Sequence, residues 1–344
     1  MLDDFKYIKQ VDSDNALGIA ARQHEQLEYE FESVQWSKFN VQCQNVVLAG
    51  MGGSALAALV AQTWPGLNVP FEVTRGYSAP SYVSPETLFI ASSYSGNTEE
   101  TVGALAEAEA KQAQIVVMSS GGKLAEIARA KKYPLLLIPT GYQPRHVLPY
   151  GLKALCTIFD AYKLTDGKAK EVSSHAAWLK AQIAAWLPEV PTADNRAKQI
   201  AQDCVGKSAV IYGGPLMAPA AYKWKISFNE NAKHIAWWNQ YSEFNHNEFI
   251  GWSKQPVDKP YTVIDIRSDL EHPQITKRFE ISAKLLSGLR PDPIVVHPAG
   301  ETLLQQLLSA IVLGDFVTLY TAVLGGVNPT PVDLIEKLKG ELEK

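Results

Sequence analysis

The sequence predicts an α/β fold with two units, each built on a parallel β-sheet flanked by helices. Short apolar runs alternate with helical patterns through the first half of the chain, and this alternation is typical of βαβ units. The alternation starts again in the second half, at the apolar run of residues 208–214. A chain of 344 residues is long enough for two domains of ordinary size.

The first half is expected to contain a helical amino-terminal segment followed by the first sheet. Residues 16–30 are mostly good helix formers, and the helical segment is expected to reach about residue 37. The expected strands are the apolar runs 45–49, 70–74, 87–91, 114–118 and 134–138. The helices expected between them are 55–64, 99–111 and 122–131.

The second half is expected to repeat this organisation after a helical connection. Residues 150–190 are mainly helical in pattern, with a polar break at 164–167. The expected strands are 208–214, 234–238, 261–266 and 293–297, and the expected helices are 216–229, 273–287 and 302–324. The expected domain bounds are 1–37 for the helical segment, 38–165 for the first α/β domain, 166–195 for the connection and 196–344 for the second α/β domain with its C-terminal helix.

The composition is that of a globular protein. The formal net charge of −4 gives no electrostatic case for binding nucleic acid or a membrane surface. No apolar run of about eighteen residues is present, and the polar, acidic start does not resemble a signal peptide. The three cysteines, Cys43, Cys156 and Cys204, are isolated, so neither a disulfide framework nor a metal-type pair is expected. A cytoplasmic location is the simplest expectation.

A hydroxyl-rich loop, SSYSGNTEE at residues 92–100, lies between an apolar strand and a helix. With the free N–H groups at the start of the helix, three hydroxyl groups could hold a phosphate; they belong to Ser93, Ser95 and Thr98. Asn97 is expected to cap the helix, with Glu100 completing a capping box. The alternative is a cap and a turn without a ligand, and the two glutamates would repel a phosphate unless they point away.

A second loop of this kind, GMGGS at residues 50–54, follows the preceding strand. Gly53 and Ser54 let a ligand approach the carboxyl end of that strand, where open α/β sheets bind ligands. The loop also fits the dinucleotide pattern G-x-G-x-x-G/A. That pattern expects a carboxylate at the end of the next strand, but Glu72 lies early in its strand. Two loops of phosphate type therefore favour a sugar phosphate.

GMGGS followed by SYSGNTEET resembles the SIS (sugar isomerase) domain, most closely that of the archaeal and bacterial bifunctional phosphoglucose/phosphomannose isomerases. The resemblance covers nearly the whole chain. Further matching motifs follow in the same order: QPR at 143–145, FNENAK at 228–233, NHNE at 245–248, GVNPTP at 326–331 and LK at 338–339. The resemblance implies two tandem SIS domains, each with a parallel five-stranded sheet. Because the joint at 213–216 lacks a serine, only the first domain is expected to bind phosphate.

The resemblance also implies roles for two residues in the second half. FNENAK matches the family segment that carries the proton-transfer glutamate, which places that role at Glu230. Taken alone, the segment would more often be a solvated glutamate beside Lys233. His246 is implied to open the sugar ring, the alternative being a loop histidine without a task. Glu248 is a fallback base, whose other expected roles are to orient His246 or to serve the fold.

Further roles come from the other matching motifs. The QPR match gives Arg145 a substrate-facing role, stabilising an enediolate, where the alternative is a surface arginine. A lysine of the final helix is implied to reach the active site, with Lys339 the first choice and Lys337 the second; the alternative is a solvated helix face. Thr330 resembles the threonine that leaves room for either configuration at C2, and it could also cap the final helix.

Other conspicuous side chains are expected to be structural. The aromatic cluster of Trp224, Trp237, Trp238 and Tyr241 is expected to form core or a subunit interface. No pair of histidines has the spacing of metal ligands, so His234, His272 and His297 are expected to serve the fold.

The resemblance predicts reversible isomerisation of glucose 6-phosphate or mannose 6-phosphate to fructose 6-phosphate through an enediol, with no cofactor and no metal. The expected partners are the hexose 6-phosphate and a second copy of the chain, in a homodimer with the active site at the subunit interface. One alternative is a non-catalytic SIS protein that senses a sugar phosphate. The others are a nicotinamide-dependent dehydrogenase and an amino-sugar isomerase, which would need an amidotransferase domain or ammonia.

Overall fold

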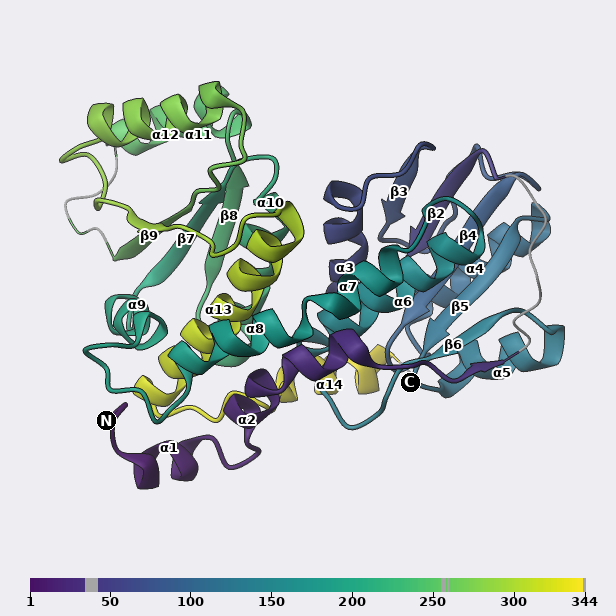
Figure 1. Cartoon of the computed structure of the whole chain (residues 1–344), viewed down its shortest axis with the longest axis horizontal. Coiled ribbons are helices and arrows are strands. Elements are labelled where there is room, and N and C mark those ends of the chain that lie inside the picture. The colour runs from purple at the N-terminus through teal and green to yellow at the C-terminus, as the bar shows by residue number, and fades with distance from the viewer. Residues whose placement is uncertain (35–42, 255–257, 259, 343–344) are drawn as a thin grey trace. The chain divides into compact units, whose positions relative to one another are not determined.

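A computed structural model describes residues 1–34, 43–254, 258 and 260–342 (Figure 1). The chain divides into two compact units. The first-sheet unit is Gln23–Trp178, and the second-sheet unit combines Met1–Arg22 with Leu179–Lys344. The expected helical segment at the amino terminus is therefore shared between the units. It ends at Glu28, and Ser33–Val34 form a strand, so the expectation that it stays helical to about residue 37 is wrong.

Six strands form the first sheet, in the order β1-β6-β5-β4-β2-β3. They are β1 (Ser33–Val34), β2 (Asn45–Ala49), β3 (Phe71–Thr74), β4 (Thr87–Ser93), β5 (Gln114–Ser119) and β6 (Leu135–Leu137). All neighbours are parallel except β1, which pairs antiparallel with β6. The five expected strands thus form a parallel sheet, and β1 extends it at one edge.

Helices cover both faces of this sheet. Helices α3 (Gly52–Thr63) and α6 (Leu148–Ala161) lie on one face, while α4 (Glu99–Ala110) and α5 (Gly122–Lys131) lie on the other (Figure 1). A core cluster joins β2, β4 and β5 to α4 and α5. Because both faces are covered, every residue of β4 is buried, which explains its continuous apolar pattern.

The remaining helices before the second sheet are short. They are α1 (Phe5–Val11), α2 (Ala16–Ala21), η1 (Gln23–Glu28), η2 (Pro144–His146), α7 (Lys168–Ser174), α8 (Ala176–Ile183), η3 (Ala184–Trp186) and α9 (Arg196–Cys204). The helical pattern expected over residues 150–190 is thus present, and the expected break falls between α6 and α7. Gly167 has a φ of 66° there, a conformation that glycine adopts at little cost.

Four parallel strands form the second sheet within the described residues, in the order β10-β9-β7-β8. They are β7 (Ser208–Gly213), β8 (Ala236–Gln240), β9 (Tyr261–Ile266) and β10 (Ile294–Val296). Each strand overlaps one of the expected apolar runs, although β8 begins and ends two residues later than the expected run 234–238. The family resemblance implied five strands here, and the described part of the chain contains four.

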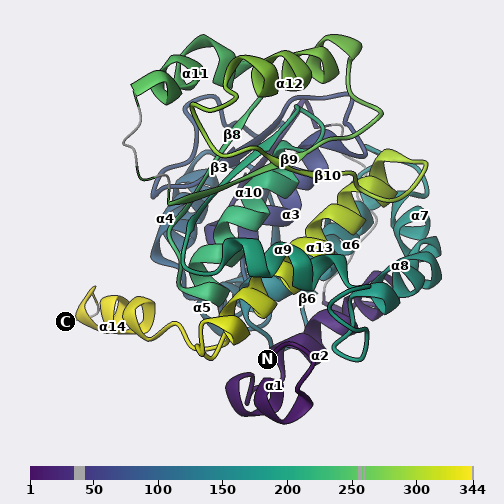
Figure 2. The ribbon, with the colours of Figure 1, turned by 90° about the vertical axis from the view of Figure 1, so that its left-hand side faces the viewer.

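Helices also surround the second sheet. They are α10 (Ala218–Ser227), η4 (Phe228–Ala232), η5 (Glu243–His246), α11 (Glu248–Gly251), η6 (Trp252–Lys254), α12 (Pro273–Leu285), α13 (Leu303–Leu324) and α14 (Asp333–Leu342). Helix α13 packs against α9 and α10 (Figure 2). A second core cluster joins β7 and β9 to η5 and α12, so the sheet is covered on both faces.

In the described part of the chain, α13 is the one helix long and apolar enough to cross a membrane by length and composition alone. However, 94% of its apolar window is buried inside the protein, as in a core helix.

A carboxylate fills the joint between β7 and α10. Glu271 Oε1 accepts the N–H of Leu216 at 2.8 Å. A Cβ on Gly214 would lie 2.3 Å from the same oxygen, so the close approach requires glycine. Burial raises the pKa of Glu271, while N–H bonds from Leu216 and Met217 lower it by a smaller amount. The side chain therefore uses a backbone donor that a phosphate would need at this position.

We expect Glu271→Gln to change how stability depends on pH. The pKa of Glu271 is raised, so the folded protein holds this proton more tightly than the unfolded chain does. Ionisation of Glu271 therefore lowers the free energy of unfolding as the pH rises through the pKa of the folded state. Glutamine keeps the acceptor for Leu216 but does not ionise. The free energy of unfolding of the variant minus that of the parent should grow between about pH 4 and pH 7 in urea titrations.

Glu280→Gln, at an exposed position of α12, is the matched control. A difference for Glu271→Gln that stays constant or shrinks over the same pH range would contradict the expectation.

Candidate functional site

The three hydroxyl groups of the loop after β4 lie in one tight turn. Ser93 Oγ is 2.7 Å from Thr98 Oγ1 and 3.5 Å from Ser95 Oγ. Ser93 Oγ also accepts the N–H of Gly96 at 3.1 Å. The turn lies at the start of α4, where free backbone N–H groups face outward from the helix.

Asn97 does not cap α4, and the expected capping box is wrong. The helix begins at Glu99 with Thr98 at its N-cap, and no side chain makes a capping hydrogen bond. Asn97 Oδ1 instead accepts the N–H of Lys123 at 2.9 Å, in the first turn of α5. An N–H in the first turn of a helix has no acceptor within that helix, so the Lys123 N–H is available to the side-chain oxygen of Asn97. Glu99 is exposed and accepts the hydroxyl of Tyr77 at 3.2 Å.

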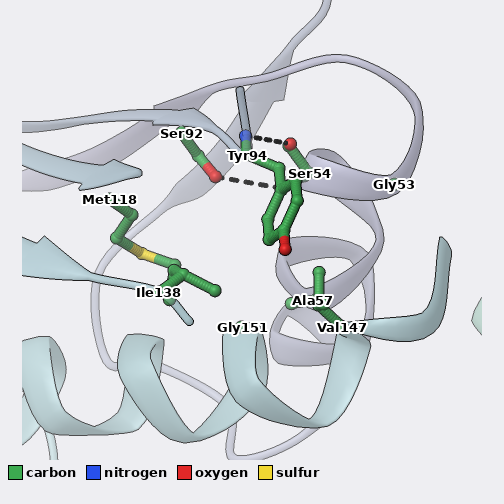
Figure 3. Close-up of a pocket in the computed structure, with 9 residues that line it drawn as sticks. All are labelled: Gly53, Ser54, Ala57, Ser92, Tyr94, Met118, Ile138, Val147 and Gly151. Carbon is green, nitrogen blue, oxygen red and sulfur yellow. Dashed lines mark hydrogen bonds between the residues drawn. The ribbon is translucent and has the colours of Figure 1, made fainter. Parts of the chain in front are cut away.

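The GMGGS segment forms the first turn of α3 and contacts two other loops. Ser54 Oγ accepts the N–H of Tyr94 at 2.9 Å, and Ser54 O accepts the hydroxyl of Ser92 at 3.1 Å (Figure 3). Because Ser54 Oγ accepts this bond, its own proton can be donated to a ligand. A Cβ on Gly53 would lie 2.6 Å from the carbonyl carbon of Pro144, so glycine is required beside the QPR turn.

Tyr94 connects the loops that follow β2, β4, β5 and β6. Its Oη donates to Pro139 O at 2.8 Å and accepts the N–H of Tyr142 at 3.0 Å. Its carbonyl oxygen accepts the N–H of Ser120 at 3.0 Å, and its own N–H donates to Ser54. Burial raises the pKa of Tyr94, so the side chain stays a neutral donor. One residue therefore ties together the loops at the carboxyl ends of four strands.

A small cavity of about 20 Å³ lies beneath these loops (Figure 3). Its lining consists of Gly53, Ser54, Ala57, Ser92, Tyr94, Met118, Ile138, Val147 and Gly151. This volume is enough for about one water molecule. The cavity is therefore a packing space, and a sugar would have to bind outside it.

Arg145 lies in the short helix η2 (Pro144–His146), and it is fully buried. The alternative of a surface arginine is wrong. Its Nη1 atom lies 3.4 Å from Gln143 Oε1. Gln26, in the helix η1 near the start of the chain, also holds this turn, because its Nε2 donates to His146 O at 2.9 Å. A buried guanidinium keeps its charge, which suits the stabilisation of an oxyanion.

In the second-sheet unit, Glu230 lies in the π-helical turn η4, which continues α10. Its side chain is half-buried. π-Helical turns are rare in proteins, and those that do occur are often found at functional sites. Lys233 Nζ donates to the carbonyl oxygen of Glu230 at 2.5 Å and to Pro329 O at 3.0 Å. The lysine therefore joins the Glu230 turn to the NPTP segment.

Thr330 follows this second contact directly. Its N–H donates to Asn328 Oδ1 at 3.0 Å, and Asn328 Nδ2 donates to Asp14 Oδ2 at 2.7 Å. Helix α14 begins at Asp333, so the expectation that Thr330 caps this helix is wrong. The chain continues through Pro331 before the helix starts, and Thr330 remains part of the turn.

His246 is exposed at the end of η5. The neighbouring Glu248 accepts the hydroxyl of Tyr212 and, at 2.8 Å, Asn239 Nδ2. Burial, and then the nearby Glu248 carboxylate, raise the pKa of Tyr212, so this hydroxyl remains a donor. Because both oxygens of Glu248 are bonded to strand residues, its role in holding the loop fits the structure best.

Lys337 and Lys339 lie on α14, which has no buried residue. Lys339 Nζ pairs with Glu336 Oε1 at 2.8 Å, and both side chains are exposed. Such a pair contributes little to stability. Among the predicted residues of this unit, the structure thus brings Glu230 and the Thr330 segment together through Lys233, while His246 and Lys339 lie on separate elements.

The remaining predictions concern structural side chains. Trp224 and Tyr241 are fully buried, whereas Trp237 and Trp238 are exposed on β8. His272 caps α12, where its Nδ1 accepts the N–H of Gln274. No group of three His, Cys, Asp or Glu side chains that could hold a metal occurs among the described residues.

Comparisons with known proteins match both halves of the chain. The SIS domain model matches residues 41–140, and the model of the bacterial phospho-glucose isomerase C-terminal SIS domain matches residues 193–342. A bifunctional phosphoglucose/phosphomannose isomerase from Caldicellulosiruptor bescii is 34% identical, over 92% of this chain and 96% of that protein. This chain belongs to the bifunctional phosphoglucose/phosphomannose isomerase family. The family and the two-domain SIS fold expected from the motifs are confirmed.

Other similar proteins differ in name. A D-glucosamine-6-phosphate 4-epimerase from Sulfolobus acidocaldarius is 30% identical, over 86% of this chain and 88% of that protein. A crystal structure of a glucose-6-phosphate isomerase like protein from Thermus thermophilus has a TM-score of 0.65 and 18% identity, with 98% of both chains covered. At that identity the likeness shows the fold alone.

Two residues of this family member were missed by sequence reasoning. Tyr94 is a large side chain inside the polar SYSGNTEE loop, and that contrast was the available signal. Lys233 was considered only as a neighbour of the Glu230 carboxylate. Its φ of 58° turns the chain after η4, and no feature of the sequence predicts its contact with Pro329.

Tyr94→Phe should loosen the turn that carries Arg145. The change removes the hydroxyl that bonds Pro139 O and the Tyr142 N–H, at a cost of roughly 1–3 kcal/mol for the groups left behind. Amide hydrogen exchange over residues 139–147 should become faster.

Tyr82→Phe is the matched control, because the Tyr82 hydroxyl donates to Glu72 on β3, in the same unit. Exchange over 139–147 that is equally fast in the parent and in Tyr94→Phe would show that the hydroxyl does not hold this turn.

Proposed function

We propose that this protein interconverts glucose 6-phosphate or mannose 6-phosphate with fructose 6-phosphate. The observation that carries the proposal is the 34% identity to a bifunctional phosphoglucose/phosphomannose isomerase across nearly the full length of both chains. The residue types that this reaction needs are present: hydroxyl groups on a phosphate-type loop, a carboxylate, a histidine and a buried arginine.

The phosphate of the substrate is proposed to bind to the loops of the first-sheet unit. The hydrogen-bond donors would be the hydroxyl groups of Ser54, Ser93, Ser95 and Thr98 with the backbone N–H of Gly53. The start of α4 adds the positive end of a helix dipole. Glu99 is turned toward Tyr77, which supports the proposal because it takes one acidic group away from the loop.

Glu230 is proposed to carry the proton between C1 and C2. Starting from fructose 6-phosphate, its carboxylate takes a proton from C1, and the C–H electron pair forms the C1=C2 bond as the C2 carbonyl oxygen becomes an enediolate oxygen. A proton then moves from O1 to O2, the aldehyde forms at C1, and Glu230 returns its proton to C2. The overall reaction is redox-neutral, so no nicotinamide is needed. Delivery of the proton to one face of C2 gives the glucose configuration, and delivery to the other face gives the mannose configuration.

Other residues receive roles from their match to the family motifs. His246 and Lys339 are proposed to open the sugar ring and relay protons, with Lys337 as the second choice of lysine. Arg145 is proposed to stabilise the enediolate, which its burial supports because a charge–charge contact is stronger away from water. Thr330 is proposed to leave space for either configuration at C2.

We further propose that the protein is a cytoplasmic homodimer in which His246 of one copy serves the site of the other. No metal is proposed, because proton transfer between adjacent carbons needs only a base and an oxyanion donor. The predicted domain bounds of 38–165 and 196–344 are retained as part of this proposal.

A second candidate is epimerisation of an amino-sugar phosphate, favoured by the similarity to a D-glucosamine-6-phosphate 4-epimerase. That similarity is lower than the identity to the C. bescii isomerase, 30% against 34%. Incubating the purified protein with fructose 6-phosphate and, separately, with glucosamine 6-phosphate distinguishes the two reactions. Product formation from neither would favour a sensor.

Ser95→Ala combined with Thr98→Ala should weaken binding of the phosphate. Each lost hydrogen bond to a charged group is worth roughly 1.5–3 kcal/mol. The KM for fructose 6-phosphate should therefore rise, and inhibition by inorganic phosphate should weaken in parallel. Ser174→Ala, on α7 of the same unit, is a control in which the hydroxyl bonds only its own helix. An unchanged KM in the double variant would remove this loop from the substrate site.

Glu230→Gln should abolish catalysis while leaving substrate binding intact. Glutamine keeps the shape and polarity but cannot accept a proton, and a positioned base contributes roughly 10²–10⁴-fold in rate. Isomerisation and the exchange of tritium between solvent and C1 should be lost together. Inhibition by inorganic phosphate should stay at the parent level.

Glu280→Gln serves again as the control for a glutamate remote from the turn. Near-parent activity of Glu230→Gln would place the base elsewhere, and Glu248 is then the next residue to change.

A further inference from the structure

A buried polar network lies directly beneath the Glu230 turn, within the second-sheet unit. Lys223 and Ser227 on α10 meet Asp315 on α13: Lys223 Nζ pairs with Asp315 Oδ1, and Ser227 Oγ lies 2.6 Å from Lys223 Nζ and 3.0 Å from Asp315 Oδ1. All three side chains are at most 1% exposed. Burying charged and polar side chains costs free energy, so each of them needs well-placed hydrogen-bond partners.

The network continues into the turn itself. Asn231, the residue after Glu230, donates from Nδ2 to Thr318 Oγ1 at 2.9 Å. The Thr318 hydroxyl in turn donates to carbonyl oxygens of its own helix, at 2.9 Å and 3.0 Å. Both side chains are fully buried. The hydroxyl thus acts as donor and acceptor at once, and it links the π-helical turn to α13.

The two helices also approach closely just before this link. A Cβ on Gly314 would lie 2.2 Å from Trp224 Nε1, and that indole nitrogen donates to Ala310 O at 2.7 Å. Helix α10 is therefore held against α13 along its length, and the turn that continues it is anchored at its end. A π-helical turn is a departure from regular helix, and it persists where its surroundings determine it.

We propose that Thr318 and Asn231, supported by the Lys223–Asp315 pair, are positioning residues that set the orientation of Glu230. This inference rests on the proposed role of Glu230 as the base. Asn231 is adjacent to Glu230 in a single turn, so an anchor at Asn231 fixes the backbone from which the Glu230 side chain extends. Proton transfer requires a near-attack geometry, and small displacements are costly in rate.

The test compares Thr318→Val with Thr321→Val. Both threonines are fully buried on α13 and donate to a carbonyl of their own helix, Thr321 to Val317 O at 2.8 Å. Only Thr318 is an acceptor for the Glu230 turn. Thr318→Val should lower kcat by about tenfold or more, with the KM for fructose 6-phosphate and the inhibition by inorganic phosphate unchanged. Thr321→Val should keep the kcat of the parent.

Thr318→Ser keeps the hydroxyl and should restore most of the parent kcat. Thermal unfolding of each variant corrects for any loss of folded protein, because a purely structural defect would lower Tm without lowering the kcat of the folded molecules. A parent-level kcat in Thr318→Val, or an equal loss in Thr321→Val, would overturn the positioning role.

The failure of the proposed function would look different. A parent protein with no isomerase activity on either hexose 6-phosphate, or an active Glu230→Gln, removes the base itself and the positioning role with it. An active parent, an inactive Glu230→Gln and an unaffected Thr318→Val overturn only the inference drawn here from the buried network.

Discussion

Ser93, at the end of β4, pairs with Ser119, at the end of β5, in a parallel register. Because parallel strands end at the same edge of a sheet, the loops that follow them leave it next to one another. A Cβ on Gly96 would lie 1.9 Å from Gly121 O, so the backbones of these two loops are in direct contact. The gathered hydroxyl groups, the loop contacts of Tyr94 and the placement of the QPR turn all depend on this alignment.

The second sheet has the same parallel construction, but its chemistry is organised along a pair of helices. The Lys223–Asp315 pair joins α10 to α13, and the Asn231–Thr318 bond joins the η4 turn to α13. A buried ion pair is weak evidence for stability, and fixing one arrangement among several is its better-supported use. Here the arrangement that is fixed is a π-helical turn carrying a carboxylate. The two units thus reach precise geometry by different means, loop against loop in one and helix against helix in the other.

The sequence predicted those parts of the molecule that depend on local pattern. The parallel strands of the first sheet were predictable because a strand covered on both faces is a continuous apolar run. The strand β1 has only two residues and no such run, so it was missed. The capping role of Asn97 was wrong because its actual partner, Lys123, lies in the first turn of another helix, α5. The contacts of Tyr94 and Lys233 likewise join segments far apart in the chain. Roles in chemistry came from the family motifs, since the residue types alone also fit solvated side chains.

Glu271 makes the two copies of the strand–loop–helix joint unequal. The Glu271 carboxylate is part of the chain, so its effective concentration at the Leu216 N–H is set by the fold. Unlike the occupancy of a dissolved anion, its occupancy does not depend on concentration in solution. A free anion would have to compete with this permanent intramolecular ligand. The joint after β7 therefore already holds an anionic side chain, and the phosphate site proposed for the first-sheet unit has no open counterpart at this joint.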